Sequence, residues 1–350
     1  MLDKHGLHCV AWFSMMAVGC FVNSAGEQDS AGETGGSGQA ESSDDSTTPD
    51  PTGEADGSTA GDSGMATDDG NGVELRHAMV EVEGIQTLTA GFHYEAWAVL
   101  DDAPVSLGKF NVDASAVITD LNGIAIVDGL LDGGRDLRDA SEFILTIESA
   151  GDIDITPAET HFLAGDHVDE AAVLTVGGGS LAFGDDFTAA RGAFILATPT
   201  DGPDNNESSG LWFLDLSTEP VSPGLELPEL PAGWEYEGWA VIDGVPITTG
   251  RFLEPTAPDF AAPFSGELDG PSVPGEDFLV NPPMNVEFPA ELRGAVAVIT
   301  IEPEPDDSPA PFGALRPVLR DIPDDAATGQ TFTMTNNAAS FPTLTLTLVP

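Results

Sequence analysis

The densest set of oxygen-bearing side chains lies in the segment Asp201-Gly202-Pro203-Asp204-Asn205-Asn206-Glu207. Calcium takes about six to eight oxygen ligands, so this segment is a candidate surface calcium site. The candidate ligands are Asp201, Asp204, Asn206 and Glu207. The spacing matches no EF-hand pattern, however, and hairpin turns use the same residue types. We expect a turn here and no cofactor, and we keep calcium as the alternative.

A second set of candidate ligands combines two imidazoles with carboxylates: His161, Asp166, His167 and Asp169. Its spacing resembles no established zinc motif. The sequence also contains no Gly-x-Ser-x-Gly elbow, no P-loop, no His-Glu-x-x-His and no cysteine in a catalytic motif. Carboxylate pairs are numerous, but in a chain with 60 acidic residues a pair says little about glycosidase chemistry. We predict that the protein is not an enzyme.

Cys20 is a candidate for covalent lipid attachment. Residues 7–18 are mostly apolar, too few to span a membrane as a helix but suited to the core of a signal peptide. The following Ala17-Val18-Gly19-Cys20 resembles the lipobox of bacterial lipoproteins, which implies removal of residues 1–19 and a diacylglycerol on Cys20. Phe21, rather than Asp, favours the outer membrane under the sorting rule of that family. The alternative is a plain secretory peptide with an incidental cysteine.

Residues 20–72 are rich in Gly, Ser, Asp and Glu and contain no Lys or Arg. They hold too little apolar surface to offset the loss of chain entropy, so we predict a disordered acidic tether. The whole chain has a formal net charge of −50. Nucleic acid binding needs clustered Lys and Arg, so we predict that nucleic acid is not a partner. The membrane is expected as a partner through the lipid alone.

The folded part of the chain contains an internal repeat. Residues 91–110 read GFHYEAWAVLDDAPVSLGKF and residues 233–252 read GWEYEGWAVIDGVPITTGRF, with ten identical positions at a constant spacing of 142 (239 − 97). Each copy reads as a β-hairpin: an apolar strand, a turn that is Asp243-Gly244 in the second copy, and a returning strand. Gly108 and Gly250 predict a bulge or a tight packing point in the returning strand.

The repeat carries four aromatic residues and two possible ion pairs. Tyr94, Trp97, Tyr236 and Trp239 could line a carbohydrate or peptide groove. Aromatic residues on an apolar strand more often pack inward, so we interpret them as core. Glu95 with Lys109, and Glu237 with Arg251, recur at the same separation in both copies, and a hairpin would bring each pair together across its two strands.

Weaker matches extend the repeat beyond the hairpin. Residues 143–148 match 297–302, where Thr-Ile-Glu is identical, and residues 193–199 match 344–350, which we interpret as the closing strand of each copy. Residues 79–85 and 225–230 look like entering strands, and residues 254–289 look like a surface excursion. The pattern predicts an all-β fold with two tandem antiparallel β-sandwich domains, at residues 73–200 and 201–350.

The motif Tyr-x-x-Trp-x-Val-x-x-x-x-Pro-x-x-x-Gly-x-Phe, followed by Ile-Thr-Ile-Glu-Pro, resembles the extracytoplasmic domain of anti-sigma-K factors. The second copy fits better, from Tyr236 to Phe252 and then Glu302 and Pro303, whereas the first has Ser149 in place of the proline. The sigma-binding domain and membrane-spanning helix of that family have no counterpart in the sequence. The resemblance therefore implies a sensing or interaction role and not sigma inhibition.

These observations lead to a functional expectation. We expect a non-catalytic lipoprotein of the bacterial outer membrane, facing the periplasm or the surface, that binds or senses a protein or glycan ligand. One alternative is a calcium-dependent adhesion or structural module of the envelope. Another is a carboxylate-based glycan hydrolase, which would need an open cleft with two close carboxylates and one raised pKa.

Overall fold

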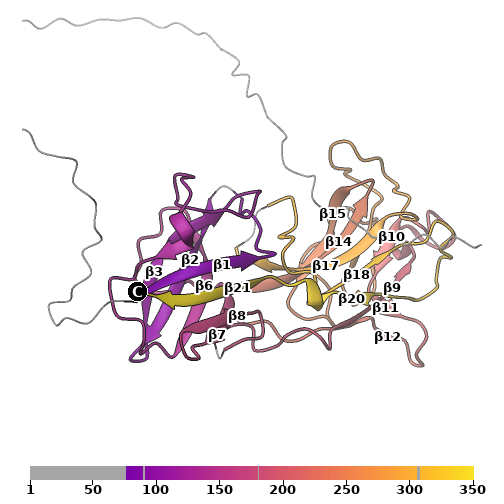
Figure 1. Ribbon diagram of the computed structural model, residues 1–350. Coiled ribbons are helices and arrows are strands. Elements are labelled where there is room, and N and C mark those ends of the chain that lie inside the picture. The colour runs from indigo at the N-terminus through magenta and orange to yellow at the C-terminus, as the bar shows by residue number, and fades with distance from the viewer. Residues whose placement is uncertain (1–75, 90, 180, 306–307) are drawn as a thin grey trace, which may run out of the picture. The chain divides into compact units, whose positions relative to one another are not determined.

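The computed structural model describes residues 76–350 except 90, 180, 306 and 307. The predicted signal peptide, Cys20 and the predicted tether therefore lie outside the described residues. The described part consists of antiparallel β-sheets, and its helical elements are three short 3-10 turns (Figure 1). These turns are η1 (Val127–Gly129), η2 (Pro199–Asp201) and η3 (Ala338–Ser340). The prediction of an all-β fold is confirmed.

Each copy of the repeat builds a five-stranded sheet, which we call its hairpin sheet. The first has the strand order β4-β3-β2-β6-β7 and the second the order β15-β14-β17-β18-β20. The strands of the first are β2 (Phe92–Leu100), β3 (Ala103–Val112), β4 (Ile118–Thr119), β6 (Glu142–Ser149) and β7 (His161–Asp166). Those of the second are β14 (Trp234–Ile242), β15 (Val245–Phe252), β17 (Val296–Pro303), β18 (Val318–Asp321) and β20 (Thr335–Asn336).

The predicted hairpins form in both copies, with the same turn and the same bulge. Asp101 and Asp102 both have positive φ, as do Asp243 and Gly244, which is the backbone of the type I′ turn that matches strand twist. The pairing register between the two strands of the hairpin shifts opposite Gly108 in the first copy and opposite Gly250 in the second. The bulge predicted from the two glycines is confirmed.

The two bulge glycines provide a matched pair of substitutions. Both have positive φ, 137° at Gly108 and 116° at Gly250, so alanine is strained at either position. At Gly250 the added Cβ would also lie 2.5 Å from Asp259 Cγ, whereas at Gly108 its nearest neighbour is Leu131 Cδ2 at 3.7 Å. We expect Gly250→Ala to lower the free energy of unfolding by about 2 kcal/mol more than Gly108→Ala, because the Asp259 side chain must move. Equal losses in urea titrations of the two variants would contradict this account.

Two further sheets, the closing sheets, contain the strands that enter and leave the repeats. The first closing sheet has the order β5-β1-β21-β8, with β1 (His77–Glu83), β5 (Leu130–Leu131), β8 (Ala171–Leu174) and β21 (Thr343–Val349). The second has the order β13-β9-β10-β16, with β19 also paired to β9. Its strands are β9 (Arg191–Leu196), β10 (Gly210–Trp212), β13 (Leu225–Glu226), β16 (Gly275–Asp277) and β19 (Phe332–Thr333). A separate ribbon joins β11 (Leu214–Asp215) to β12 (Ser222–Pro223).

The closing strands are exchanged between the two copies. β21, at the end of the second copy, pairs with β1 from His77↔Val349 to Glu83↔Thr343 and with β8 on its other side (Figure 1). β9, at the end of the first copy, pairs with β13, β10 and β19 of the second. The prediction that each closing strand completes its own copy is therefore wrong. The predicted domain boundary between residues 200 and 201 falls between β9 and β10. These two strands are neighbours in one sheet, so the boundary does not separate the sheets of the two copies.

Chain connectivity provides a physical reason for this exchange. The long connection 175–190 lets the chain leave the first copy after β8, and β9 then continues through η2 into β10, its own sheet neighbour. The alternation of Leu and Thr in β21 gives one buried and one outward face, which suits either closing sheet.

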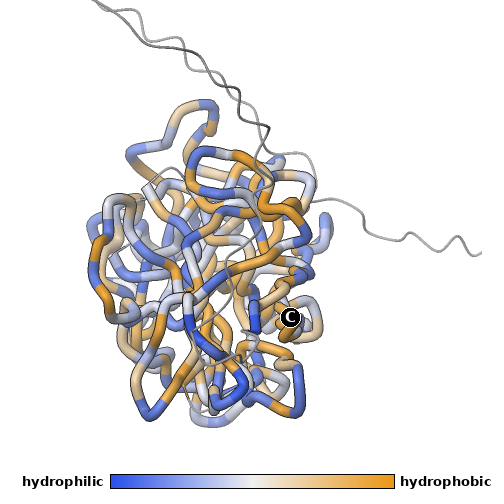
Figure 2. Tube along the Cα trace, turned by 60° about the vertical axis from the view of Figure 1, so that its left-hand side comes forward, coloured by the Kyte–Doolittle hydropathy of each residue, from blue (hydrophilic) through white to orange (hydrophobic). Residues whose placement is uncertain are grey.

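A shared hydrophobic core joins the two copies. One cluster of buried side chains runs from Ala78 in β1 to Leu348 in β21 and includes residues of both copies. Along the chain, hydrophobic and hydrophilic stretches alternate, and several loop tips are strongly hydrophilic (Figure 2). The segment 254–289, expected as a surface excursion, contributes buried residues such as Phe278 to this core and carries β16.

Candidate functional site

The four repeated aromatic side chains belong to the core and line no surface groove. Tyr94, Trp97, Tyr236 and Trp239 are all at most 2% exposed. Each tyrosine hydroxyl donates a hydrogen bond to a backbone carbonyl eight residues earlier, at 2.9 Å in the first copy and 2.8 Å in the second. A buried hydroxyl needs such a partner, so these bonds are structural. The interpretation of these residues as core is confirmed.

Behind each tryptophan lies a buried polar relay that the hairpin motif does not reveal. In the second copy Trp239 Nε1 donates to Thr300 Oγ1 at 2.8 Å, and Thr300 Oγ1 donates to Glu302 Oε1. In the first copy Trp97 Nε1 donates to Thr146 Oγ1 at 3.0 Å, and Thr146 donates to Glu148. The identical Thr-Ile-Glu in the two copies was the available sequence signal for this relay.

Each relay also fixes a loop. The Glu148 carboxylate accepts the backbone N–H of Ala158 at 2.9 Å, and the Glu302 carboxylate accepts that of Phe312 at 2.7 Å. The accepting residue is thus ten positions before the donor in both copies. These glutamates are 2% and 1% exposed, so their acceptor capacity is used inside the fold.

The basic residue of each hairpin contacts a carboxylate of its own copy. Lys109 Nζ lies 3.4 Å from Glu95 Oε2 and 2.8 Å from Asp152 Oδ2, so the first expected contact is present. The hydrogen bond from Lys109 holds the pKa of Asp152 below its usual range, while burial raises that of Glu95.

In the second copy Glu237 and Arg251 are cross-strand neighbours, as predicted. Arg251 Nη1 lies 2.8 Å from Glu235 Oε1, a carboxylate that the prediction did not include. Glu235 occupies the position held by His93 in the first copy. The basic residue of the second hairpin is therefore anchored by a residue specific to that copy.

The segment 201–207 has the geometry of a turn. Glu207 Oε1 accepts the backbone N–H of Asp204 at 2.9 Å, and Asn206 Nδ2 donates to Asp201 Oδ2 at 2.8 Å. Asp204 and Asn206 have positive φ, as turn residues often do. In the part of the chain that the structure describes, no group of three His, Cys, Asp or Glu side chains is placed to hold a metal ion. Calcium binding at this segment stays a prediction.

The two histidines of the proposed zinc set do not converge. His161 begins β7 and His167 follows its other end. His161 Nδ1 lies 2.7 Å from the carbonyl oxygen of Leu181, and His167 Nδ1 lies 2.9 Å from that of Ala140. The zinc hypothesis is therefore wrong for this pair.

Three carboxyl groups with raised pKa values lie at β16: Glu276 and Asp277 are buried in the strand, and the half-buried Asp259 accepts the backbone N–H of Gly275. Burial raises the pKa of Asp259 to about 6 and that of Glu276 to about 7, and it also raises the pKa of Asp277. Asp277 accepts hydrogen bonds from Trp212 Nε1 at 2.7 Å and from the backbone N–H of Thr200 at 2.8 Å. Glu276 and Asp277 are 0% exposed, so they lack the open cleft that a hydrolase would need.

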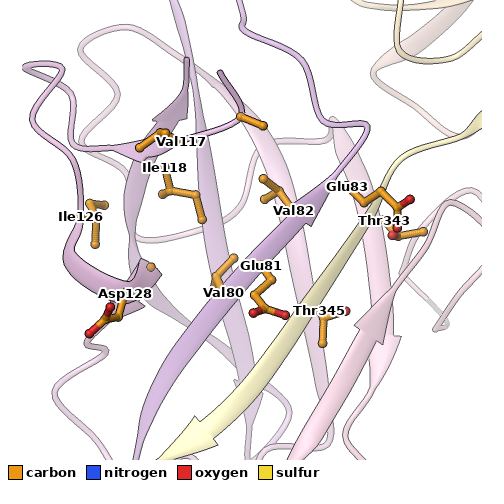
Figure 3. Close-up of a pocket in the computed structure, with 12 residues that line it drawn as sticks. Val80, Glu81, Val82, Glu83, Val117, Ile118, Ile126, Asp128, Thr343 and Thr345 are labelled. Atoms are coloured by element: carbon orange, nitrogen blue, oxygen red, sulfur yellow. The ribbon is translucent and has the colours of Figure 1, made fainter. Parts of the chain in front are cut away.

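The surface feature best placed to receive a partner is a groove of about 670 Å³ beside β1. Four separate segments line it: residues 80–83, 116–118, 126–129 (without 127), and Thr343 and Thr345 of β21. Figure 3 shows the valines of β1 and Ile118 flanking the space, with Glu81 and Glu83 on the side of β21. Because β21 belongs to the second copy, the exchange of strands builds the groove from both copies.

The groove combines apolar walls with acidic groups. Val82, Ile118 and Ile126 supply apolar surface, and its charged residues are Glu81, Glu83 and Asp128. The lining residue Val117 and the neighbouring Leu121, Ile124 and Val127 are 41–77% exposed. No motif in the sequence could have revealed this groove, because segments far apart in the chain build it.

A second hollow, of about 330 Å³, lies where loop 152–160 approaches Gly233 and residues 303–305. Phe92 and several acidic residues line it, among them Glu148, which the relay already uses.

No protein-family model matches this sequence, and neither the curated proteins nor the solved structures yielded a significant match. Among the residues that the structure describes, none forms a helix with the length and apolar character needed to cross a membrane. The functional argument therefore depends on the groove and on the sequence.

Proposed function

We propose that this chain is a non-catalytic binding or sensing protein of the bacterial cell envelope. In this proposal the folded all-β part, built from both copies of the repeat, acts outside the cytoplasm, and a lipid on Cys20 holds it at the outer membrane. The observation that carries the binding role is the groove beside β1, which offers about 670 Å³ of partly apolar space. Ligand clefts commonly measure about 300–1,000 Å³.

The environment of the buried carboxylates supports a non-catalytic role. Glu148, Glu302 and Asp277 each accept hydrogen bonds from the protein's own side chains and backbone. Groups that are already committed to the fold and shielded from solvent are poorly placed to meet a substrate. The resemblance to the exterior domains of anti-sigma-K factors agrees with an interaction role, without any sigma-binding function.

Site-specific photocrosslinking in the producing cells tests the binding role. A photoreactive amino acid at Val117, in the groove, should capture a partner as a covalent adduct of higher mass. The matched control is Val173, an exposed valine on β8 that does not line the groove. No adduct at residue 117 beyond those formed at residue 173 would overturn the proposal.

The proposed lipid anchor predicts the behaviour of a Cys20→Ser variant. Without the thiol no diacylglycerol can be attached, so the protein should move from the membrane pellet to the soluble envelope fraction. Immunoblots of the two fractions, together with the intact mass of the detergent-extracted protein, provide the measurement. A variant that stays in the membrane fraction would show that another feature anchors the chain.

A further inference from the structure

The edge of β1 that faces the groove has no strand partner along half its length. On one side β21 pairs with all seven residues of β1. On the other side β5 pairs only with Ala78 and Met79. From Val80 to Glu83 no described strand adjoins this edge. Gly129 of η1 already lies against the Val80 carbonyl, so the backbone groups available to another chain are those at residues 81–83.

The groove lies along this open edge and has two chemically distinct sides. Val80 and Val82 alternate with Glu81 and Glu83 along β1, so neighbouring side chains face opposite sides of the sheet. The valines face Ile118 across the space, and the glutamates lie on the side of β21 (Figure 3). An added strand would therefore meet apolar groups on one of its faces and acidic groups on the other.

Charge selects the kind of strand that fits. The lining contains Glu81, Glu83 and Asp128 but no Lys, Arg or His. A second copy of this chain, with its formal net charge of −50, would be repelled, as acidic side chains at sheet edges commonly ensure. A cationic segment would instead be attracted and guided to the edge.

We propose that the groove binds an extended peptide segment of a partner protein, in which basic and apolar residues alternate, as an added strand beside Glu81–Glu83. Backbone hydrogen bonds to the β1 edge hold the segment, and the alternating side chains give specificity. This inference rests on the proposed function and names the partner's chemistry. Val117, which lines the groove and is 41% exposed, provides further apolar contact.

The test uses the full chain and a synthetic peptide, acetyl-Lys-Val-Lys-Val-Lys-Thr-Lys-amide. Its matched control carries the same side chains and charge but has methyl groups on alternate backbone nitrogens. Because any cationic peptide is attracted to so acidic a protein, this control separates strand pairing from charge alone. We expect the methylated peptide to bind about tenfold or more weakly. We also expect the unmethylated peptide to slow amide hydrogen exchange in residues 81–83.

Two variants locate the binding. Val117→Ser, on the groove rim, removes apolar contact without adding charge and should weaken binding of the unmethylated peptide about tenfold, whereas Val173→Ser, on β8, should leave it unchanged. Both positions are exposed, so both variants should keep the melting temperature of the parent. Equal binding of the two peptides, or protection elsewhere than residues 81–83, would overturn strand addition. Photocrosslinking at residue 117 would then decide separately whether the groove binds another kind of partner.

Discussion

Replacing Thr300 by valine is expected to lower the free energy of unfolding by about 3 kcal/mol. The substitution preserves the shape of the side chain but removes the hydroxyl that accepts from Trp239 and donates to Glu302. All three residues are at most 2% exposed, so water cannot replace the lost bonds. Urea unfolding followed by tryptophan fluorescence would measure the change.

The first copy and a conservative substitution provide the controls for this experiment. Thr146→Val removes the equivalent hydroxyl and should cost a similar amount, since Trp97 and Glu148 are placed in the same way. Thr300→Ser retains the hydroxyl and should cost about 1 kcal/mol or less, for the loss of a methyl group. If Thr300→Val and Thr300→Ser proved equally stable, the relay would have no energetic role.

Stability is also expected to fall as the pH rises from about 5 to about 8. The folded-state pKa of Asp259 is about 6 and that of Glu276 is about 7, both raised by burial. Groups with raised acid pKa values bind more protons in the folded state, so their stabilisation is complete at low pH and is lost as the pH rises through these values. A shift of this size corresponds to on the order of 3 kcal/mol for each group, as an upper limit.

A Glu276→Gln variant isolates one of these groups. The amide cannot ionise, and its oxygen can still accept the hydrogen bond from Ser265 that the carboxylate accepts. The free energy of unfolding, measured by urea titration across this pH range, should therefore depend less on pH in the variant than in the parent. The hydrogen bond from Lys109 lowers the pKa of Asp152, so Asp152 stabilises the fold as the pH rises, but this change occurs at more acidic pH. Unchanged pH dependence in the variant would show that Glu276 does not titrate in this window.

The local elements were predictable from the sequence because local chemistry determines them. The Asp243-Gly244 turn, the bulges at Gly108 and Gly250 and the burial of Tyr236 all follow from residue type and alternation. The relay could have been inferred only in part. The sequence shows Thr300 and Glu302 as part of a repeated motif, but it does not show that Trp239 donates to Thr300. Arg251 shows the limit of the repeat argument, since it contacts Glu235, whose position is held by His93 in the first copy.

The strand exchange and the groove could not be predicted in this way. The Leu-Thr alternation of β21 defines which face is buried but not which sheet receives it. Chain connectivity and packing of the whole determine that choice. The groove depends on the exchange, because Thr343 and Thr345 of β21 complete its lining beside Glu81 and Glu83 of β1.

The central claim is that β21 of the second copy pairs with β1 of the first, and an engineered disulfide tests it most directly. In a chain whose Cys9 and Cys20 are replaced by serine, cysteines at Met79 and Thr347 would occupy directly paired positions. We expect oxidation to form an intramolecular disulfide, seen in the intact mass and in faster migration on non-reducing gels. Cysteines at Met79 and Ala171 flank β21 about two strand spacings apart, beyond disulfide reach, and should not join. Failure of the first pair to join, with a bond instead from position 79 to a cysteine at Leu196 of β9, would contradict the exchange and the groove that depends on it.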